Sequence, residues 1–425
     1  MKKVVVVGLG YVGLPIAVAF SRCYEVFGFD TNQKKIEDYK NGIDITGEVG
    51  NDILKKTNIK FSFDEKIIKS ADYIIITVPT PVNINNEPDL NCIIAASQAV
   101  GRNLHYGVIV IYESTVYPGA TEEVCVPILE EVSGLTFNKD FFVGYSPERI
   151  NPGDKVHTFQ SINKIVSGST IETRKKIARL YQKCISGKII QVSSLKVAEA
   201  AKVMENTQRD INIAFMNEIS KIFRVMNINT NEVLQAAKTK WNFLDFHPGL
   251  VGGHCIGIDP YYLSYKVQEL GYNPELILTS RKINNSMSEY VVYNIIDNLQ
   301  KMGKEIMSSK ILIKGLTFKE NVTDIRNSRS IDIAKELIRK GAEVYLEDYN
   351  VNNNELEESQ GLSLSFFVPK VDVVVFACKH KRYYNLEIID LNDLFLNSNI
   401  KIIFDLYSIF NKEKLKKEGF IVWNL

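Results

Sequence analysis

A glycine-rich hexapeptide that directly follows four consecutive valines constrains the fold more than any other feature of this sequence. Residues 4–7 read VVVV, an unbroken apolar run that is typical of a strand buried on both faces of a parallel sheet. The sequence GLGYVG follows at residues 8–13, and residues 14–22 then have the composition of a helix that packs on the sheet. Asp30 ends a second apolar run, 22 residues after Gly8. This order of strand, glycine loop, helix and acidic strand end predicts a dinucleotide-binding α/β unit.

Each residue type in this motif has a chemical role in binding a dinucleotide. Gly8, Gly10 and Gly13 permit a tight turn, the close approach of a pyrophosphate and the close packing of the helix. The N-terminus of the helix stabilises the phosphate charge. The carboxylate of Asp30 accepts hydrogen bonds from a ribose diol and repels a 2′-phosphate, which favours NAD over NADP. The alternative is a glycine-rich turn in an unrelated α/β protein.

Buried strands are predicted in the first third of the chain and again in the last third. The first third has further apolar runs at residues 72–77 and 108–112. The runs in the last third lie at residues 310–315, 342–348, 371–377 and 401–405. The stretches between the runs are long enough for helical crossovers. The sequence therefore predicts an α/β fold with two doubly wound, nucleotide-binding-type domains.

The middle of the chain is predicted to be helical. Residues 195–225 contain neither Gly nor Pro and predict one long helix, and residues 280–302 predict another. Between them lies a loop rich in Gly and Pro, at residues 247–260, followed by a short helical piece. The expected domain boundaries are residues 1–194, 195–300 and 301–425.

Composition excludes several classes of function. The chain has 425 residues, 45% of them hydrophobic, which is enough for two or three domains. The 51 Lys and Arg residues balance 50 Asp and Glu residues, so no global charge points to nucleic acid or to a membrane surface. The six cysteines form no CxxC pair, which argues against a disulfide framework or a zinc site and favours reduced thiols in the cytoplasm. The uncharged run at residues 4–20 imitates a signal peptide, but its glycines and Pro15 fit the nucleotide motif instead.

One cysteine lies in a loop that is too rich in glycine to belong to a packed core. The loop reads PGLVGGHCIGIDP at residues 248–260 and contains Cys255. If a helix starts near Cys255, its N-terminus lowers the pKa of the thiol and makes a nucleophilic thiolate available. An inert buried thiol is the interpretation that fits the other five cysteines. The side chains of neighbouring residues often diverge, so His254 is more readily a structural or substrate-facing residue than a catalytic partner of Cys255.

Two further segments carry candidate polar groups. Lys202 and Asn206 are four residues apart and share one face of the predicted long helix. A solvated stripe that includes Asp210 is the alternative for them. Glu148, in the sequence SPERINPG at residues 146–153, follows an apolar strand and is expected at the edge of the sheet where ligands bind. A surface turn is the alternative there.

Taken together in this order, these segments resemble the UDP-glucose/GDP-mannose dehydrogenase family along the whole chain. The motifs that carry the resemblance are GLGYVG at residues 8–13, TVPTP at 77–81, ESTVYPGAT at 113–121, SPER at 146–149, AAKVMEN at 200–206, GGHCIGIDPYYL at 252–263 and GLTFKENVTDIRNS at 315–328. The resemblance implies two Rossmann-like domains joined by a long central helix, with a helical middle domain that forms a homodimer. It also implies that the first domain binds NAD and the last binds the UDP moiety of the substrate.

The same resemblance implies roles for individual residues, and no metal. The implied NAD-binding residues are Gly8, Gly10, Tyr11, Val12, Gly13, Asp30, Lys35, Thr80, Thr115 and Arg326. The implied catalytic residues are the nucleophile Cys255, the general acid/base Glu148, and Lys202, Asn206 and Asp259 around the reacting C6 oxygen and a water. The implied substrate-binding residues are Arg149, Phe243, Gly252, His254, Phe318 and Lys319.

The loop around Cys255 departs from the UDP-glucose dehydrogenase pattern. Those enzymes usually carry a Lys three residues after the nucleophile, where this chain has Ile258. The segment at residues 241–263 resembles instead the branch that oxidises UDP-N-acetylglucosamine or UDP-N-acetylgalactosamine for capsule, Vi-antigen and O-antigen. UDP-glucose, UDP-ManNAc and GDP-mannose remain alternative substrates. A two-electron dehydrogenase and a non-catalytic NAD- or nucleotide-sugar-binding protein are the alternatives of other classes.

Overall fold

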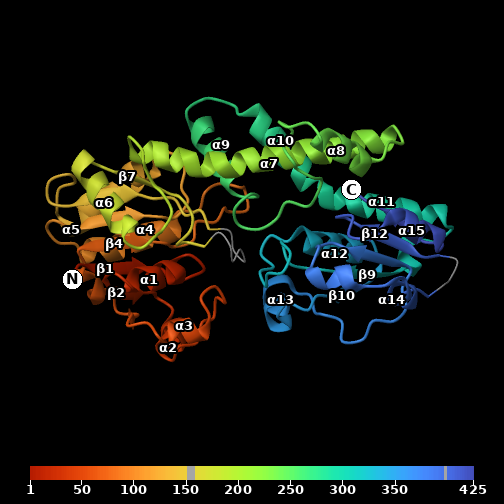
Figure 1. Cartoon of the computed structure of the whole chain (residues 1–425), viewed down its shortest axis with the longest axis horizontal. Helices are drawn as coiled ribbons and strands as arrows, with labels where there is room; N and C mark the ends of the chain where they lie inside the picture. The colour runs from red at the N-terminus through yellow and green to blue at the C-terminus, as the bar shows by residue number, and fades with distance from the viewer. Residues whose placement is uncertain (151–157, 397–399) are drawn as a thin grey trace. The chain divides into compact units, whose positions relative to one another are not determined.

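The computed structural model describes residues 1–150, 158–396 and 400–425 (Figure 1). The chain divides into two compact units, and each is described by itself. The first unit comprises residues 1–205 and 261–273, and the second comprises residues 206–260 and 274–425. The division into three domains at residues 194 and 300 stays a prediction. None of the helices in the described ranges is both long enough and apolar enough to cross a membrane.

The first unit is built on an eight-stranded sheet with the order β3-β2-β1-β4-β5-β6-β7-β8. All neighbouring strands are parallel except β6 and β7, which are antiparallel. The strands are β1 (Lys3–Val7), β2 (Glu25–Phe29), β3 (Lys60–Ser62), β4 (Tyr73–Ile76), β5 (Ile109–Tyr112), β6 (Phe142–Tyr145), β7 (Lys164–Gly168) and β8 (Ile189–Gln191). The strand order reverses between β1 and β4, so the loop after β1 emerges at the point where open α/β sheets bind ligands.

The valine run forms the centre of this sheet, as predicted. Val5 lies opposite Phe27 of β2 on one side and Ile74 of β4 on the other, and it is fully buried. On one face, α1 and α6 supply Phe20 and Ile177 to the core. The uncharged run at residues 4–20 therefore forms the buried strand and helix of the nucleotide motif. The helices of this unit are α1 (Gly13–Ser21), α2 (Gln33–Lys40), α3 (Asn51–Leu54), α4 (Asn91–Arg102), α5 (Val126–Ser133) and α6 (Ile171–Gln182).

Two helices contribute to both units. The first is α7 (Leu195–Val225), which has the bounds that the sequence predicts and is drawn in yellow-green in Figure 1. The second is α9 (Asp259–Glu269), most of which belongs to the first unit. There the hydroxyl of Tyr262 donates a hydrogen bond to the carbonyl oxygen of Pro81 (3.0 Å), and Lys266 pairs with Glu123 (2.7 Å). This return of the chain makes residues 261–273 an integral part of the first unit.

The second unit contains a five-stranded parallel sheet with the order β10-β9-β11-β12-β13, drawn in blue in Figure 1. The strands are β9 (Lys310–Lys314), β10 (Glu343–Glu347), β11 (Val373–Phe376), β12 (Ile402–Asp405) and β13 (Ile421–Trp423). One face packs against α11 and α12, and the other against α14 and α15. The helices are α8 (Thr230–Lys238), α10 (Glu275–Asn285), α11 (Met287–Lys301), α12 (Arg329–Arg339), α13 (Asn353–Gln360), α14 (Ile388–Asp393) and α15 (Lys412–Lys417).

The single helix predicted at residues 280–302 is wrong in one respect, because two helices occupy this stretch. Helix α10 ends at Asn285 and α11 begins at Met287. The hydroxyl of Ser286 donates to the carbonyl oxygen of Ile283 (2.8 Å), and this side chain competes with the helical hydrogen-bond pattern. Ser286 therefore marks the boundary between α10 and α11, although the apolar periodicity of the segment predicted one continuous helix.

Candidate active site

The glycine loop and Asp30 form a compact arrangement at the carboxyl ends of β1 and β2. Gly8 has a φ of +88°, and its N–H donates to the carbonyl oxygen of Phe29 (2.9 Å). The N–H groups of Leu9 and Asn32 donate to the two carboxylate oxygens of Asp30 (2.9 and 3.0 Å). The loop after β1 and the end of β2 are therefore fixed to each other through one carboxylate.

The glycines differ in what surrounds them. A Cβ atom at Gly13 would lie 1.9 Å from the carbonyl oxygen of Gly8 and 2.5 Å from the hydroxyl of Thr77. A Cβ atom at Gly10 would meet nothing within 4 Å. Gly13 is thus required by packing inside the protein, whereas Gly10 borders open space at the start of α1. This is the cradle that a pyrophosphate needs at a helix N-terminus, so the residues present fit NAD.

The structure brings most of the predicted cofactor residues together in the first unit. Lys35, whose backbone N–H is capped by the side chain of Asn32, places its ammonium 2.9 Å from the carboxylate of Asp30. Thr80 and Thr115 follow the adjacent strands β4 and β5 at the same edge of the sheet. Tyr11 and Val12 lie in the glycine loop itself, and both are partly exposed. Arg326 belongs to the second unit, where it forms an ion pair with Asp324 (2.5 Å).

Glu148 is buried, so the surface-turn alternative for this residue is wrong. Glu148 follows β6 in the sequence. One of its carboxylate oxygens accepts hydrogen bonds from the N–H groups of Arg149 and Ile150 (both 2.6 Å). The other oxygen lies 3.1 Å from the ammonium of Lys164, a fully buried residue of β7. Burial alone would raise the pKa of Glu148, but Lys164 and the two N–H groups lower it below its ordinary value. The site therefore holds Glu148 as a carboxylate. Residues 151–153 of the predicted SPERINPG segment lie outside the described residues.

A second carboxyl group shares the same lysine. Glu113 is buried, accepts a hydrogen bond from the hydroxyl of Tyr181 and forms an ion pair with Lys164. Burial raises the pKa of Glu113 to about 7, against the opposing effect of Lys164. Sequence reasoning missed both Glu113 and Lys164 as part of the site. The available signals were a lysine in an otherwise apolar strand and the acidic first residue of the ESTVYPGAT motif.

The three candidate polar residues of α7 are buried, which excludes the solvated-stripe alternative. Lys202 is 8% exposed, Asn206 is 4% exposed and Asp210 is fully buried. Asn206 donates to the carboxylate of Asp259 (2.5 Å), so the structure joins two of the predicted catalytic residues. Asp210 pairs with the buried guanidinium of Arg281 (2.6 Å) and has a structural role. Lys202 belongs to the first unit, as Glu148 does.

Cys255 is exposed and precedes α9. The N–H of Asp259 donates to the carbonyl oxygen of Cys255 (2.9 Å), which is the first hydrogen bond of helical type at this end of α9. Cys255 therefore lies one turn before the first residue of α9. His254 is half-buried, and burial together with the nearby charge of Arg326 lowers its pKa, so it is uncharged at neutral pH.

The predicted substrate residues Gly252 and Phe318 lie where two loops of the second unit meet. A Cβ atom at Gly252 would lie 2.5 Å from the carbonyl oxygen of Asn327, and one at Gly253 would lie 2.5 Å from the ring of Phe318. The N–H of Gly253 also donates to the carbonyl oxygen of Asn327 (3.4 Å). The loop that carries Cys255 thus packs directly against the 315–328 segment, which carries Phe318 and Lys319.

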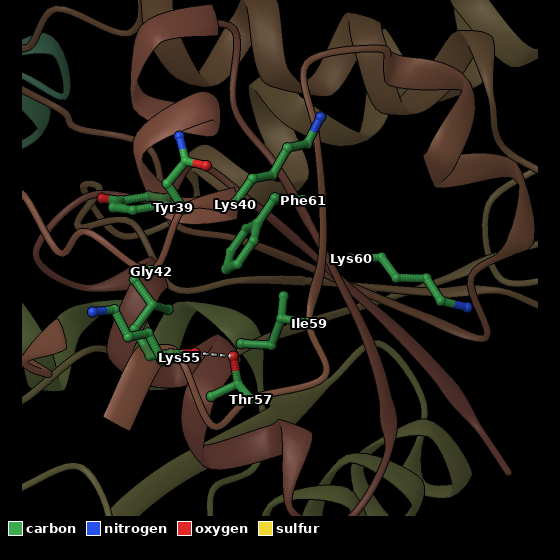
Figure 2. A pocket seen from close by; sticks show the side chains of 10 residues that line it. Tyr39, Lys40, Gly42, Lys55, Thr57, Ile59, Lys60 and Phe61 are labelled. Carbon is green, nitrogen blue, oxygen red and sulfur yellow. Dashed lines mark hydrogen bonds between the residues drawn. The ribbon is translucent and has the colours of Figure 1, made fainter. Parts of the chain in front are cut away.

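The two remaining substrate predictions are Arg149 and Phe243. Arg149 forms an ion pair with Glu205 (2.8 Å) in the first unit, and Phe243 is half-buried in the segment after α8. A polar hollow in the first unit, shown in Figure 2, contains none of the predicted site residues. It lies around the end of α2 and the start of β3, and Lys40, Lys55 and Lys60 are among its lining residues.

Comparisons with known proteins identify the family of the chain. The UDP-glucose/GDP-mannose dehydrogenase family is matched by its NAD binding domain at residues 2–185, its central domain at residues 196–286 and its UDP binding domain at residues 312–412. The chain is 51% identical to protein CapL of Staphylococcus aureus and 47% identical to UDP-N-acetyl-D-glucosamine 6-dehydrogenase of Salmonella typhi, each over 97% of both chains. The structure of UDP-D-ManNAc dehydrogenase from Pyrococcus horikoshii is similar with a TM-score of 0.89 and 28% identity, over 100% of this chain and 99% of that one.

These matches cover the glycine loop, the buried residues of α7, the Cys255 segment and the 315–328 segment, which are the features from which the sites above were built. The chain belongs to the UDP-glucose/GDP-mannose dehydrogenase family and is an NAD-dependent nucleotide-sugar dehydrogenase.

Proposed function

We propose that this enzyme oxidises the C6 hydroxyl of a UDP-N-acetylhexosamine, UDP-GlcNAc or UDP-GalNAc, to the corresponding uronate in a four-electron reaction. The observation that carries this proposal is the exposed Cys255 in the turn before α9, in a loop that packs against the 315–328 segment. Ile258, in the place of the lysine of UDP-glucose dehydrogenases, supports the N-acetylhexosamine branch, as do the names of relatives at 47% identity.

Cys255 accounts for the second half of the oxidation. When bound, NAD accepts a hydride in each of the two oxidations. The thiolate of Cys255 adds to the C6 aldehyde and forms a thiohemiacetal, whose oxidation gives a thioester. Water then hydrolyses the thioester, releases the carboxylate and regenerates the thiol. Covalent attachment keeps the aldehyde on the enzyme and makes the second oxidation another hydride transfer.

The buried polar residues supply the remaining roles. Lys202 and Asn206 donate hydrogen bonds to the oxyanion at C6, and loss of one such donor typically costs about 10²–10³ in kcat. Asp259, which Asn206 contacts, helps to orient the hydrolytic water. Glu148 is held as a carboxylate by Lys164, which suits a base that removes a proton from this water better than an acid.

The wider assignments are part of the same proposal. The three domains at residues 1–194, 195–300 and 301–425 would bind NAD, mediate homodimerisation and bind the UDP moiety, respectively. The product would be used for a surface polysaccharide such as a capsule, and the reaction would take place in the cytoplasm. UDP-ManNAc is the second candidate substrate, because the similar structure from Pyrococcus horikoshii bears that activity in its name.

A substrate panel with counting of NADH tests the proposal. UDP-GlcNAc, UDP-GalNAc, UDP-ManNAc and UDP-glucose are compared by kcat/KM, and we expect one of the first two to be preferred. Two NADH should form per sugar, and a ratio of one would place the enzyme in the two-electron class. Cys255→Ala should abolish uronate formation and retain NAD binding, while Cys92→Ala, at the other exposed cysteine, should have near wild-type activity. Uronate formation by Cys255→Ala within about tenfold of wild type, a barrier change of ~1.4 kcal/mol, would refute the covalent mechanism.

A further inference from the structure

Helix α7 contacts the loop of Cys255 at both of its ends. At the exit of the loop, Asn206 donates to the carboxylate of Asp259 (2.5 Å). At the entrance, Asn217 forms two hydrogen bonds with the backbone of Gly249. Asn206 and Asn217 are eleven residues apart, about three helical turns, so they lie on one face of α7 roughly 16 Å apart along its axis. The nucleophile lies between these two attachment points in the sequence.

The attachment at the entrance satisfies both backbone polar groups of one residue. The amide nitrogen of Asn217 donates to the carbonyl oxygen of Gly249 (3.0 Å), and the N–H of Gly249 donates to the amide oxygen of Asn217 (2.8 Å). Asn217 is fully buried. A Cβ atom at Gly249 would lie 3.1 Å from the ring of Tyr407, so the backbone has little room to shift at this position.

A buried network in turn fixes Asn217. Its amide nitrogen also donates to the amide oxygen of Asn284 in α10 (2.8 Å). Asn284 donates to the carboxylate and the carbonyl oxygen of Asp210 (2.6 and 3.0 Å), and Asp210 pairs with Arg281. These four side chains are at most 2% exposed. Because buried hydrogen-bond networks resist rearrangement, Asn217 is held in one orientation by two helices.

From this geometry we propose that Asn217 is a positioning residue for the nucleophile. It fixes the entrance of the loop while Asn206 and Asp259 fix the exit, and together they place the thiol of Cys255 for attack on the C6 aldehyde. This inference rests on the proposed role of Cys255. Loss of the entrance attachment should slow thiolate addition, whereas the first oxidation requires no thiol and should be little affected.

Single-turnover kinetics can separate these two steps. In Asn217→Ala, we expect the first NADH to form within threefold of the wild-type rate and the second to form ten- to a hundredfold more slowly. Hydrogen exchange should become faster at residues 249–258 in particular. The matched control is Asn212→Ala on the same helix, where the amide nitrogen donates only to the carbonyl oxygen of Gln208 in the preceding turn (2.7 Å) and both rates should be unchanged.

Equal slowing of both steps, or no change in either, would overturn the proposal, since general destabilisation affects the two oxidations together. If Asn217→Ala does not fold, Asn217→Ser retains a small polar group at the site and is judged by the same ratio of rates. Cys255→Ala distinguishes the two levels of the argument. An active Cys255→Ala refutes the proposed function, whereas an inactive Cys255→Ala with an unaltered Asn217→Ala refutes only the role of Asn217.

Discussion

The two sheets share one arrangement of four parallel strands, including single hydrogen bonds. The strand order β2-β1-β4-β5 of the first sheet corresponds to β10-β9-β11-β12 of the second. Gly8 and Gly315 follow the central strands with φ values of +88° and +94°. The N–H of each donates to the last residue of the neighbouring strand, Phe29 or Glu347, at 2.9 Å. The loop that leads to the nucleotide site is therefore built in the same way twice.

The carboxylates that end the second strand of each unit also correspond, but their surroundings differ. Asp30 accepts the N–H of Leu9, and Asp348 accepts the N–H of Leu316. Beside Asp348 lies His380, fully buried, with its Nε2 3.1 Å from the carboxylate. Burial raises the pKa of the Asp348 carboxyl group. The hydrogen bond from His380 opposes this effect, and the pKa lies below its ordinary value.

The comparison shows that carboxylates at corresponding positions of the two units, Asp30 and Asp348, have different partners. In the first unit the carboxylate of Asp30 faces Lys35 at the sheet edge and suits a ribose diol. In the second unit the carboxylate of Asp348 faces His380, whose Nδ1 accepts the N–H of Asn321 (2.9 Å), and this ties the 315–328 segment to the rest of the unit. The carboxylate of Asp348 thus ties the loop after β9 to His380.

The largest expected effect is a loss of stability when His380, the histidine beside Asp348, is replaced. His380→Ala removes a buried hydrogen bond to the carboxylate of Asp348 and leaves the N–H of Asn321 without this acceptor, and the two losses together typically cost about 3–5 kcal/mol. Urea unfolding should show this loss, while NAD titration should remain as in wild type. His247→Ala, at an exposed histidine of the same unit, is the control. A change below 1 kcal/mol, about the net value of one ordinary hydrogen bond, would contradict the structural role of His380.

The next largest expected effect is a loss of NAD affinity when Gly10, in the loop after β1, is replaced by the residue found in the loop after β9. Gly8-Leu9-Gly10 corresponds to Gly315-Leu316-Thr317, so Gly10→Thr makes the two loops alike at this position. Because a Cβ atom at Gly10 meets nothing within the protein, the variant should fold and melt close to wild type. NAD affinity should fall by about a hundredfold, or ~2.7 kcal/mol, since the side chain occupies the approach of the pyrophosphate. Fluorescence titration checks this, and Gly10→Ala should show a smaller loss.

A third test uses Glu113, which follows the shared strand β5 and pairs with Lys164 of β7, a strand outside the shared scaffold. The pKa of Glu113 is raised to about 7 by burial, so the folded state binds a proton more tightly than the unfolded state does. The resulting stability is present at pH 4.5 and is lost as the pH rises through 7. Wild type should therefore lose up to about 1.4 kcal/mol per pH unit near pH 6 relative to Glu113→Gln. Parallel stability curves for the two proteins between pH 5 and 7 would show that Glu113 does not titrate in this way.

The smallest effect concerns the choice of cofactor. Asp30→Ala removes the carboxylate that repels a 2′-phosphate and leaves the ammonium of Lys35 beside the ribose site. The preference for NAD over NADP, measured as the ratio of kcat/KM values, should fall by about tenfold, or ~1.4 kcal/mol. In the double variant Asp30→Ala, Lys35→Ala, the increase in kcat/KM with NADP should be smaller, because the ammonium of Lys35 is also absent. An unchanged ratio in Asp30→Ala would show that another residue sets the preference.

The sequence predicted the elements whose signals are local. The four valines of β1 and the stretch without Gly or Pro that forms α7 were placed correctly, because burial on both faces and uninterrupted helix formers leave a continuous signature. The break at Ser286 was missed, because one side-chain hydrogen bond decided it against the periodicity. The motif glycines were located because Gly8 has a φ of +88° and Gly13 leaves no room for a Cβ atom.

Contacts between residues that are far apart in the sequence could not be predicted from it. Lys164 and Glu113 are 51 residues apart, and His380 and Asp348 are 32 apart, so neither pair has a local pattern. The repeat of a strand ending in Gly and a strand ending in an acid was predicted for the last third of the chain, but the hydrogen bonds that Gly8 and Gly315 share were not. The roles assigned to the predicted site residues remain predictions that the variants above can test.

The return of residues 261–273 to the first unit limits how this protein can be divided or recombined. A gene fragment that stops at residue 205 would encode the whole eight-stranded sheet but would omit Tyr262 and Lys266, which contact Pro81 and Glu123. Exchange of the nucleotide-binding half between related genes by a single crossover would therefore break native contacts. Substrate specificity in such enzymes is expected to change by point substitution more readily than by swapping of whole modules.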